Sequence, residues 1–155
     1  MSSLGLLSQE TARPLPSTIR DLLKPNEKPA EWELVEWITC DTDSGYYHDD
    51  TIHLYRSYHY CFGSGCCQFV RWTLSPKYTF SLTSFLFCQE PPVSGITMEN
   101  QDLKFDISGS ENRTTIAIRR KKEVIDKFEV VDLRTVTLPD NMGTSQRLTL
   151  VRIRS

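Results

Sequence analysis

Hydrophobic and polar residues alternate with a period of two over much of the chain, and the pattern starts at Thr51. In TIHLYRSYHYCF, residues 51–62, the odd positions are mostly polar and Arg56 alone breaks the apolar set. The apolar even positions are Ile52, Leu54, Tyr58, Tyr60 and Phe62. This alternation is typical of a β-strand with one buried face. We therefore expect a half-buried strand over 51–62.

Further short segments with β-branched and aromatic residues follow this strand. They cover 66–75, 77–88, 102–107, 114–120, 127–138 and 147–153. The spacers between them hold Gly, Pro, Asn or charged residues, which favour turns. About seven short strands at this spacing predict an all-β fold, a single antiparallel sandwich or barrel over residues 31–155.

The first 30 residues lack this pattern and are predicted to form a flexible N-terminal arm with one short helix. Within PSTIRDLLKP, Ser17 can cap a helix near 17–24, which Pro25 would end. Ile19, Leu22 and Leu23 would share its apolar face. Because isolated helices need roughly 12–15 residues to be stable in water, this helix should form only when docked, on this domain or on a partner. We interpret these three side chains as a binding surface for a protein partner.

The segment KPAEWELVEWITC, residues 28–40, fits two interpretations. As a helix it places Ala30, Leu34, Trp37 and Ile38 on one stripe. As a strand it places Trp32, Leu34, Ile38 and Cys40 on one face, with Glu36 out of place. The pattern favours the helix. The acidic stretch 41–50 that follows is predicted to be a solvated loop.

Charge excludes a strong general attraction to nucleic acid or anionic membranes, because the net charge of the 155 residues is −2. Residues 1–100 carry 7 basic and 12 acidic side chains, whereas residues 101–155 carry 11 and 8. The apolar-leaning run 78–88 is far shorter than the ~20 residues of a membrane helix. The chain starts without the basic and apolar parts of a secretory signal, so a cytoplasmic or nuclear location and reduced cysteines are expected.

HYCFGSGCCQF, residues 59–69, is the strongest candidate for a metal site. In a hairpin His59 and Cys61 share a face, whereas Cys66 and Cys67 point to opposite faces. Three ligands can therefore converge, and zinc needs a fourth. No C-x-x-C occurs in the chain, so a tight hairpin with small apolar cysteines is the favoured interpretation, and zinc is the alternative.

Arg119, Arg120, Lys121 and Lys122 form the one run of four basic residues. Such a run binds phosphates or acts as a nuclear-import signal, and it also occurs at charged hairpin tips that keep a turn soluble. With the positive balance of residues 101–155, it supports RNA binding as an alternative function.

The motifs of the common enzyme classes are missing. The sequence contains no G-x-S-x-G, no Walker loop, no G-x-G-x-x-G and no H-E-x-x-H. We therefore expect a non-enzymatic interaction module that binds a protein partner and holds no cofactor. A compact β domain with a leading amphipathic arm is typical of small regulatory and viral accessory proteins that bind host proteins, an analogy of architecture alone.

Overall fold

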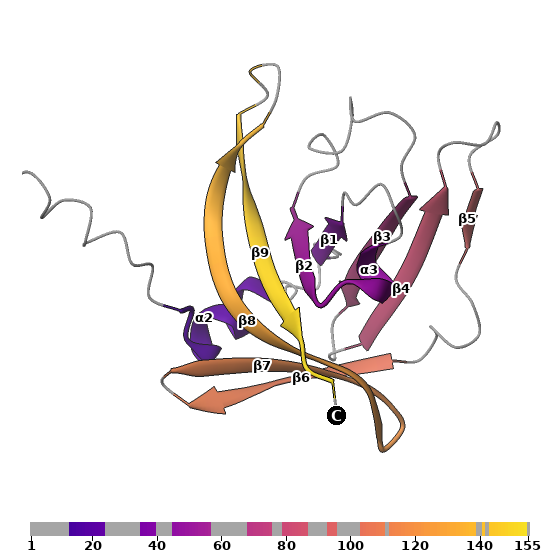
Figure 1. Ribbon diagram of the computed structural model, residues 1–155, viewed down its shortest axis with the longest axis vertical. Coiled ribbons are helices and arrows are strands. Elements are labelled where there is room, and N and C mark those ends of the chain that lie inside the picture. Colours follow the sequence, from indigo (N-terminus) through magenta and orange to yellow (C-terminus); the bar gives the residue numbers. More distant parts are fainter. Residues whose placement is uncertain are drawn as a thin grey trace, which may run out of the picture.

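The computed structural model describes residues 13–23, 35–39, 45–56, 68–75, 79–86, 93–95, 103–110, 112–138, 141 and 143–154. In this part of the chain there are two short helices and nine strands (Figure 1). The elements are α2 (Pro16–Leu23), β1 (Val35–Thr39), α3 (Gly45–His48), β2 (Thr51–Tyr55), β3 (Gln68–Ser75), β4 (Thr79–Leu86), β5 (Val93–Gly95), β6 (Leu103–Ser110), β7 (Arg113–Arg120), β8 (Glu123–Thr137) and β9 (Thr144–Arg152). Neither of these helices is long and apolar enough to cross a membrane.

Eight of the strands close into an antiparallel barrel, as the sequence predicted in its barrel alternative. The order around the barrel is β3-β1-β2-β9-β8-β7-β6-β4, and pairing between β3 and β4 closes it. The short strand β5 adds to β4 outside this ring. Strands β6 to β9 form a meander, and the β1–β2 pair lies between β3 and β9.

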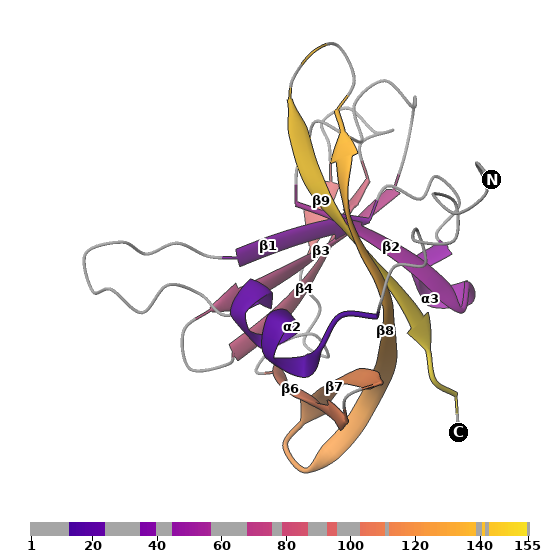
Figure 2. The ribbon, with the colours of Figure 1, turned by 90° about the vertical axis from the view of Figure 1, so that its left-hand side faces the viewer.

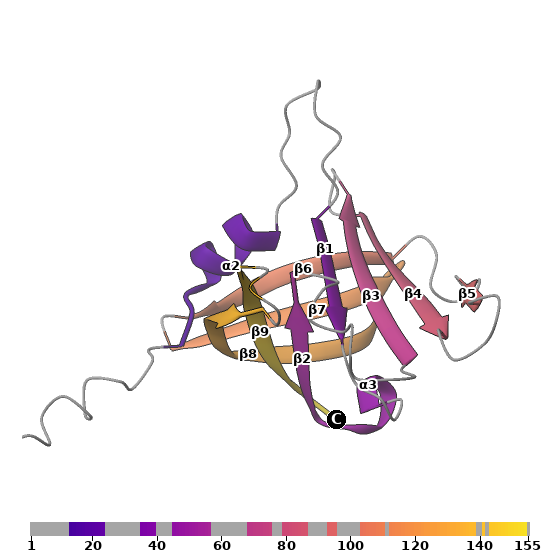
Figure 3. The same ribbon diagram turned by 90° about the horizontal axis from the view of Figure 1, so that it is seen from above.

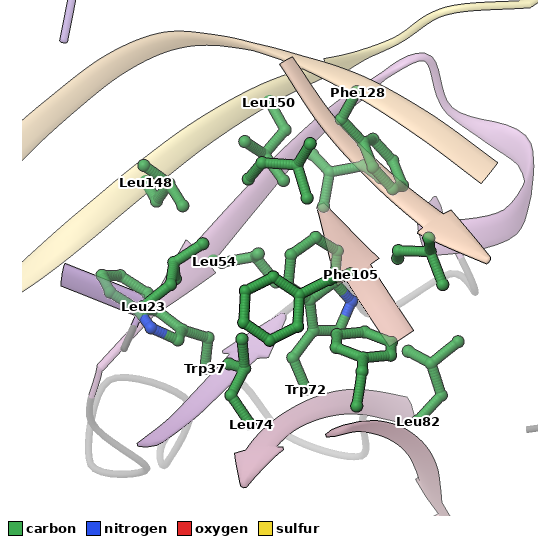
Figure 4. Packing of buried hydrophobic residues seen from close by; sticks show 14 of the residues in the cluster. Leu23, Trp37, Leu54, Trp72, Leu74, Leu82, Phe105, Phe128, Leu148 and Leu150 are labelled. Atoms are coloured by element: carbon green, nitrogen blue, oxygen red, sulfur yellow. The ribbon is translucent and has the colours of Figure 1, made fainter. Parts of the chain in front are cut away.

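One face of each barrel strand points inward, and large side chains occupy the interior. The alternation predicted for β2 is confirmed, because Ile52 and Leu54 are fully buried. Among the described residues, the side chains of a single cluster meet in the interior (Figure 4). Its aromatic members include Trp37, Trp72, Phe80, Phe105 and Phe128. An eight-stranded barrel is just wide enough for side chains to fill its interior.

The two short helices pack against different parts of this barrel, as Figures 2 and 3 show. Helix α2 contacts β6 and β7 and contributes Ile19 and Leu23 to the core. Helix α3 immediately precedes β2 and contributes Tyr46. Both elements are therefore parts of the folded domain and complete its core.

Four local predictions are corrected by the structure. The helix favoured for 28–40 is wrong where the chain is described, because Val35–Thr39 is strand β1, paired on both sides with β2 and β3. Val35 and Trp37 join the core cluster. The strand interpretation considered above instead placed Leu34 and Ile38 on the apolar face. Helix α3 lies in the predicted acidic loop, and β5 lies in a predicted spacer. Strand β8 starts within another spacer. In each case tertiary pairing or packing overrides a weak local pattern.

The turn between β7 and β8 carries backbone strain that a glycine would relieve. Arg120 pairs with Glu123, so Lys121 and Lys122 form the turn, and Lys121 has a φ of 56°. A side chain in this left-handed region costs roughly 1–2 kcal/mol, partly offset by the greater chain entropy of glycine. We expect Lys121→Gly to raise the free energy of unfolding by about 0.5–1 kcal/mol in urea denaturation. The control Lys122→Gly should not stabilise the protein. Equal effects of the two variants would contradict the inferred backbone strain at Lys121.

Candidate functional site

The side chains predicted to bind a partner from the N-terminal helix are used inside the domain. Ile19 and Leu23 are 0% exposed, and Leu22 packs against the same core. Two further contacts hold the helix: Arg20 Nη2 donates to the carbonyl of Ile107 at 2.9 Å, and the Thr114 hydroxyl donates to the carbonyl of Pro14 at 2.7 Å. While α2 is docked in this way, its apolar face cannot contact another protein.

The predicted basic run lies at the β7–β8 hairpin, and its four side chains differ in their surroundings. Arg119 pairs with Asp106 across the sheet, with Nη2 donating to Oδ1 at 3.2 Å. Arg120 is half-buried, whereas Lys121 and Lys122 are exposed at the turn. The structure therefore presents two lysines to solvent at this tip and couples Arg119 to a carboxylate.

The predicted metal ligands His59, Cys61, Cys66 and Cys67 lie outside the described residues. Within the described ranges, no group of three His, Cys, Asp or Glu side chains is placed to hold a metal ion. The zinc hypothesis therefore stays a prediction.

Several arginines on the outer surface of the C-terminal half are paired with carboxylates of the same or a neighbouring strand. Glu129 contacts both Arg113, at 3.2 Å, and Arg13 of the segment before α2. Asp132 contacts Arg134 at 2.7 Å and Arg147 at 3.9 Å. Several basic side chains of residues 101–155 are thus held in ion pairs and do not form an uninterrupted basic surface.

A buried arginine fastens α3 to the barrel. The side chain of Arg152, at the end of β9, is only 7% exposed, and its Nε lies 3.1 Å from Asp126 Oδ1. Its two Nη atoms donate to the carbonyls of Tyr46, at 2.7 Å, and Tyr47, at 3.2 Å. The guanidinium also lies over the rings of Tyr46 and Phe128, at 5.3 and 5.1 Å from their centroids. A planar guanidinium with five donors suits this set of acceptors.

Burial shifts the pKa values of two groups in this cluster. Burial raises the pKa of Tyr46 far above its usual value, and the negative charge of Asp126 adds to the effect. Its hydroxyl accepts a hydrogen bond from Trp72 Nε1 at 2.9 Å. Burial also raises the pKa of Asp126, although Arg152 acts in the opposite direction. The neutral phenol of Tyr46 is therefore a structural group that links α3 to the core.

The adjacent Tyr47 is the exposed member of the same helix. Its side chain is 45% exposed. Its ring meets Tyr46 edge-to-face with centroids 4.9 Å apart, and its hydroxyl lies 3.5 Å from Ser84 Oγ of β4. Because Arg152 binds its backbone carbonyl, Tyr47 is held in place by a buried group. The α3 platform, residues 45–48, therefore presents a pre-organised aromatic side chain.

The sequence offered no signal for this arrangement. Tyr46 and Tyr47 lie in a stretch predicted to be a loop, and Arg152 is 106 residues from Tyr46. Comparisons with protein-family models, curated proteins and solved structures found no match for this chain.

Proposed function

We propose that the protein is a non-enzymatic interaction module that binds a protein partner through the α3 platform. The observation that carries this proposal is the exposed ring of Tyr47 on a helix anchored by the buried Arg152. Tyrosine and arginine are enriched at the centres of protein interfaces. A side chain that is already held in place loses little entropy when it binds.

Two further features support binding at the outer surface. The barrel interior is occupied by the side chains of its own core. The paired arginines and carboxylates on β6 to β9 form a surface of mixed charge, which suits a protein partner better than a polyanion.

Replacement of Tyr47 by Ala should abolish capture of the partner without unfolding the domain, because the ring is exposed. We would immobilise the protein, treat cell lysate with and without nuclease, and quantify the captured proteins. Val124→Ala is the matched control, since Val124 is also an exposed apolar residue, at 51%, but lies on β8. Proteins retained by wild type and Val124→Ala but lost with Tyr47→Ala support the proposal. Capture that survives Tyr47→Ala contradicts it.

RNA binding is the second candidate, and the exposed Lys121 and Lys122 support it. Affinity for single strands falls with salt at a log–log slope of about −0.7 per neutralised phosphate, so two contacts predict roughly −1.4. Filter binding of single-stranded RNA across a salt series, with Lys121→Ser/Lys122→Ser alongside, measures this slope. A slope near that value that disappears in the variant would favour RNA. Binding that is unchanged in the variant would exclude this hairpin as the contact.

The zinc alternative is tested on the purified protein. Stoichiometric zinc that is lost in His59→Ala would assign the metal to the predicted hairpin. Its absence from protein purified with zinc present would remove this alternative.

A further inference from the structure

The β8–β9 hairpin continues beyond the other strands as a two-stranded ribbon. Strand β7 pairs with β8 as far as Val130, whereas β9 pairs with β8 up to Thr137. On the other side, β2 pairs with β9 only from Arg147 onward. In this ribbon, residues 135–137 of β8 pair with residues 144–146 of β9. The ribbon rises above the rest of the barrel in Figure 1.

The edge of β8 that points away from β9 faces no other strand of the described part of the chain from Asp132 to Thr137. This open edge begins after an irregularity in the register of β8 with β9, between Val130 and Asp132. The edge sequence DLRTVT contains no Pro, Gly or Lys and is rich in β-branched residues. Native proteins usually protect exposed edges with Pro, Lys or covering elements, and a two-stranded hairpin alone is marginally stable in water. Both properties favour the addition of another strand at this edge.

The pattern of charges on this edge is self-complementary, so the edges of two copies can pair opposite charges. Asp132 and Arg134 lie on the same face, two residues apart, and carry opposite charges. Antiparallel pairing of two such edges about Leu133 places Asp132 opposite Arg134 of a second copy, twice. Opposite charges at directly opposed positions stabilise a sheet.

Arg134 is the side chain that is open to this second contact, because it is 54% exposed and contacts Asp132 Oδ2 only through Nε. The other oxygen, Asp132 Oδ1, has no hydrogen-bond partner among the described residues but is shielded from solvent in the single copy, so the side chains around it must rearrange before a second copy can reach it. The Nη groups of Arg134 from a second copy are donors suited to that oxygen.

We propose that two copies of this chain pair through the β8 edge, antiparallel and two-fold symmetric about Leu133. The pairing spans Val131 to Thr135 of each copy and stops there because β7 occupies the edge from Val130 onward. The two barrels then share a continuous sheet. Because the contact is isologous, assembly closes at the dimer. This inference concerns a different surface from the α3 platform, so each can fail without the other.

The experiment is sedimentation velocity of the full-length protein over a wide range of concentrations. We expect a monomer–dimer equilibrium. Arg134→Glu and Asp132→Arg each place like charges opposite one another, so each variant alone should self-associate at least about tenfold more weakly. A mixture of the two variants restores opposite charges at both positions and should form a heterodimer. Circular dichroism confirms that each variant is folded.

Thr135→Lys provides a second variant should Asp132→Arg not fold. Thr135 is exposed on the ribbon, and a lysine there should block the edge. A protein that remains monomeric at all concentrations overturns the proposal. So does a dimer that persists in both Arg134→Glu and Thr135→Lys. Dimer loss in these variants, with recovery in the mixture of charge variants, establishes the paired edge.

Discussion

Replacement of Arg152 by Met is expected to lower the free energy of unfolding by about 3–5 kcal/mol, the usual cost of removing one partner of a buried ion pair. Methionine keeps the apolar stem but leaves the half-buried carboxylate of Asp126 without its counter-ion. It also removes the donors to the carbonyls of Tyr46 and Tyr47. Urea denaturation at neutral pH measures the effect. Arg154→Met is the matched control, since the Arg154–Asp50 pair is exposed and should contribute at most about 1 kcal/mol.

The stability lost in Arg152→Met should depend on pH, and the direction of this dependence follows from the protonation of Asp126. Burial raises the pKa of this carboxyl in the folded protein, so its protonated form favours folding. The associated stability is present below the unfolded pKa and is lost as pH rises through the raised pKa. Without Arg152 the pKa of Asp126 rises further. The difference in unfolding free energy between wild type and Arg152→Met should therefore shrink as pH falls. A difference that does not change with pH would show that Arg152 acts through packing alone.

Truncation of Leu23 to Ala is expected to lower the free energy of unfolding by about 2–5 kcal/mol, because it removes a fully buried side chain from the core. Leu23 belongs to the same core cluster as Trp37 of β1 and Leu148 of β9, which Figure 4 shows. Leu15→Ala is the control, since Leu15 is 47% exposed just before the same helix. It should change stability by less than about 0.5 kcal/mol. Both variants are compared by urea denaturation.

The result also decides the role of α2 in partner binding. A large loss for Leu23→Ala means that Ile19 and Leu23 stabilise the barrel in solution, as the structure shows them doing. A loss no larger than that of Leu15→Ala would contradict the docked helix. The apolar face of α2 would then be free for a protein partner, as the sequence suggested.

Most strands could be predicted from the sequence because their pattern reflects local geometry. In β2, alternate residues point to opposite faces, so burial of one face requires Ile52 and Leu54 at even positions. Segments with β-branched and aromatic residues, bounded by turn residues, located β3, β4 and β6 to β9 within a few residues. A helix near 17–24 was predictable from Ser17 and Pro25 in the sequence. The structure has this helix at Pro16–Leu23, with Ser17 inside its first turn and not at its cap. These signals act over a few residues and need no knowledge of the rest of the chain.

The remaining features were decided by contacts between distant residues. Val35–Thr39 is a strand because β2 and β3 provide pairing on both edges, although its sequence also fits a helix. Tyr46 and Tyr47 form a helix where Arg152 and Trp72 supply their partners. Burial removes water from such polar groups and leaves protein groups as their partners. The sequence by itself therefore determined the β class and most strands, whereas only the tertiary structure decided which charges are paired, which helix faces are buried and which strand edge is open.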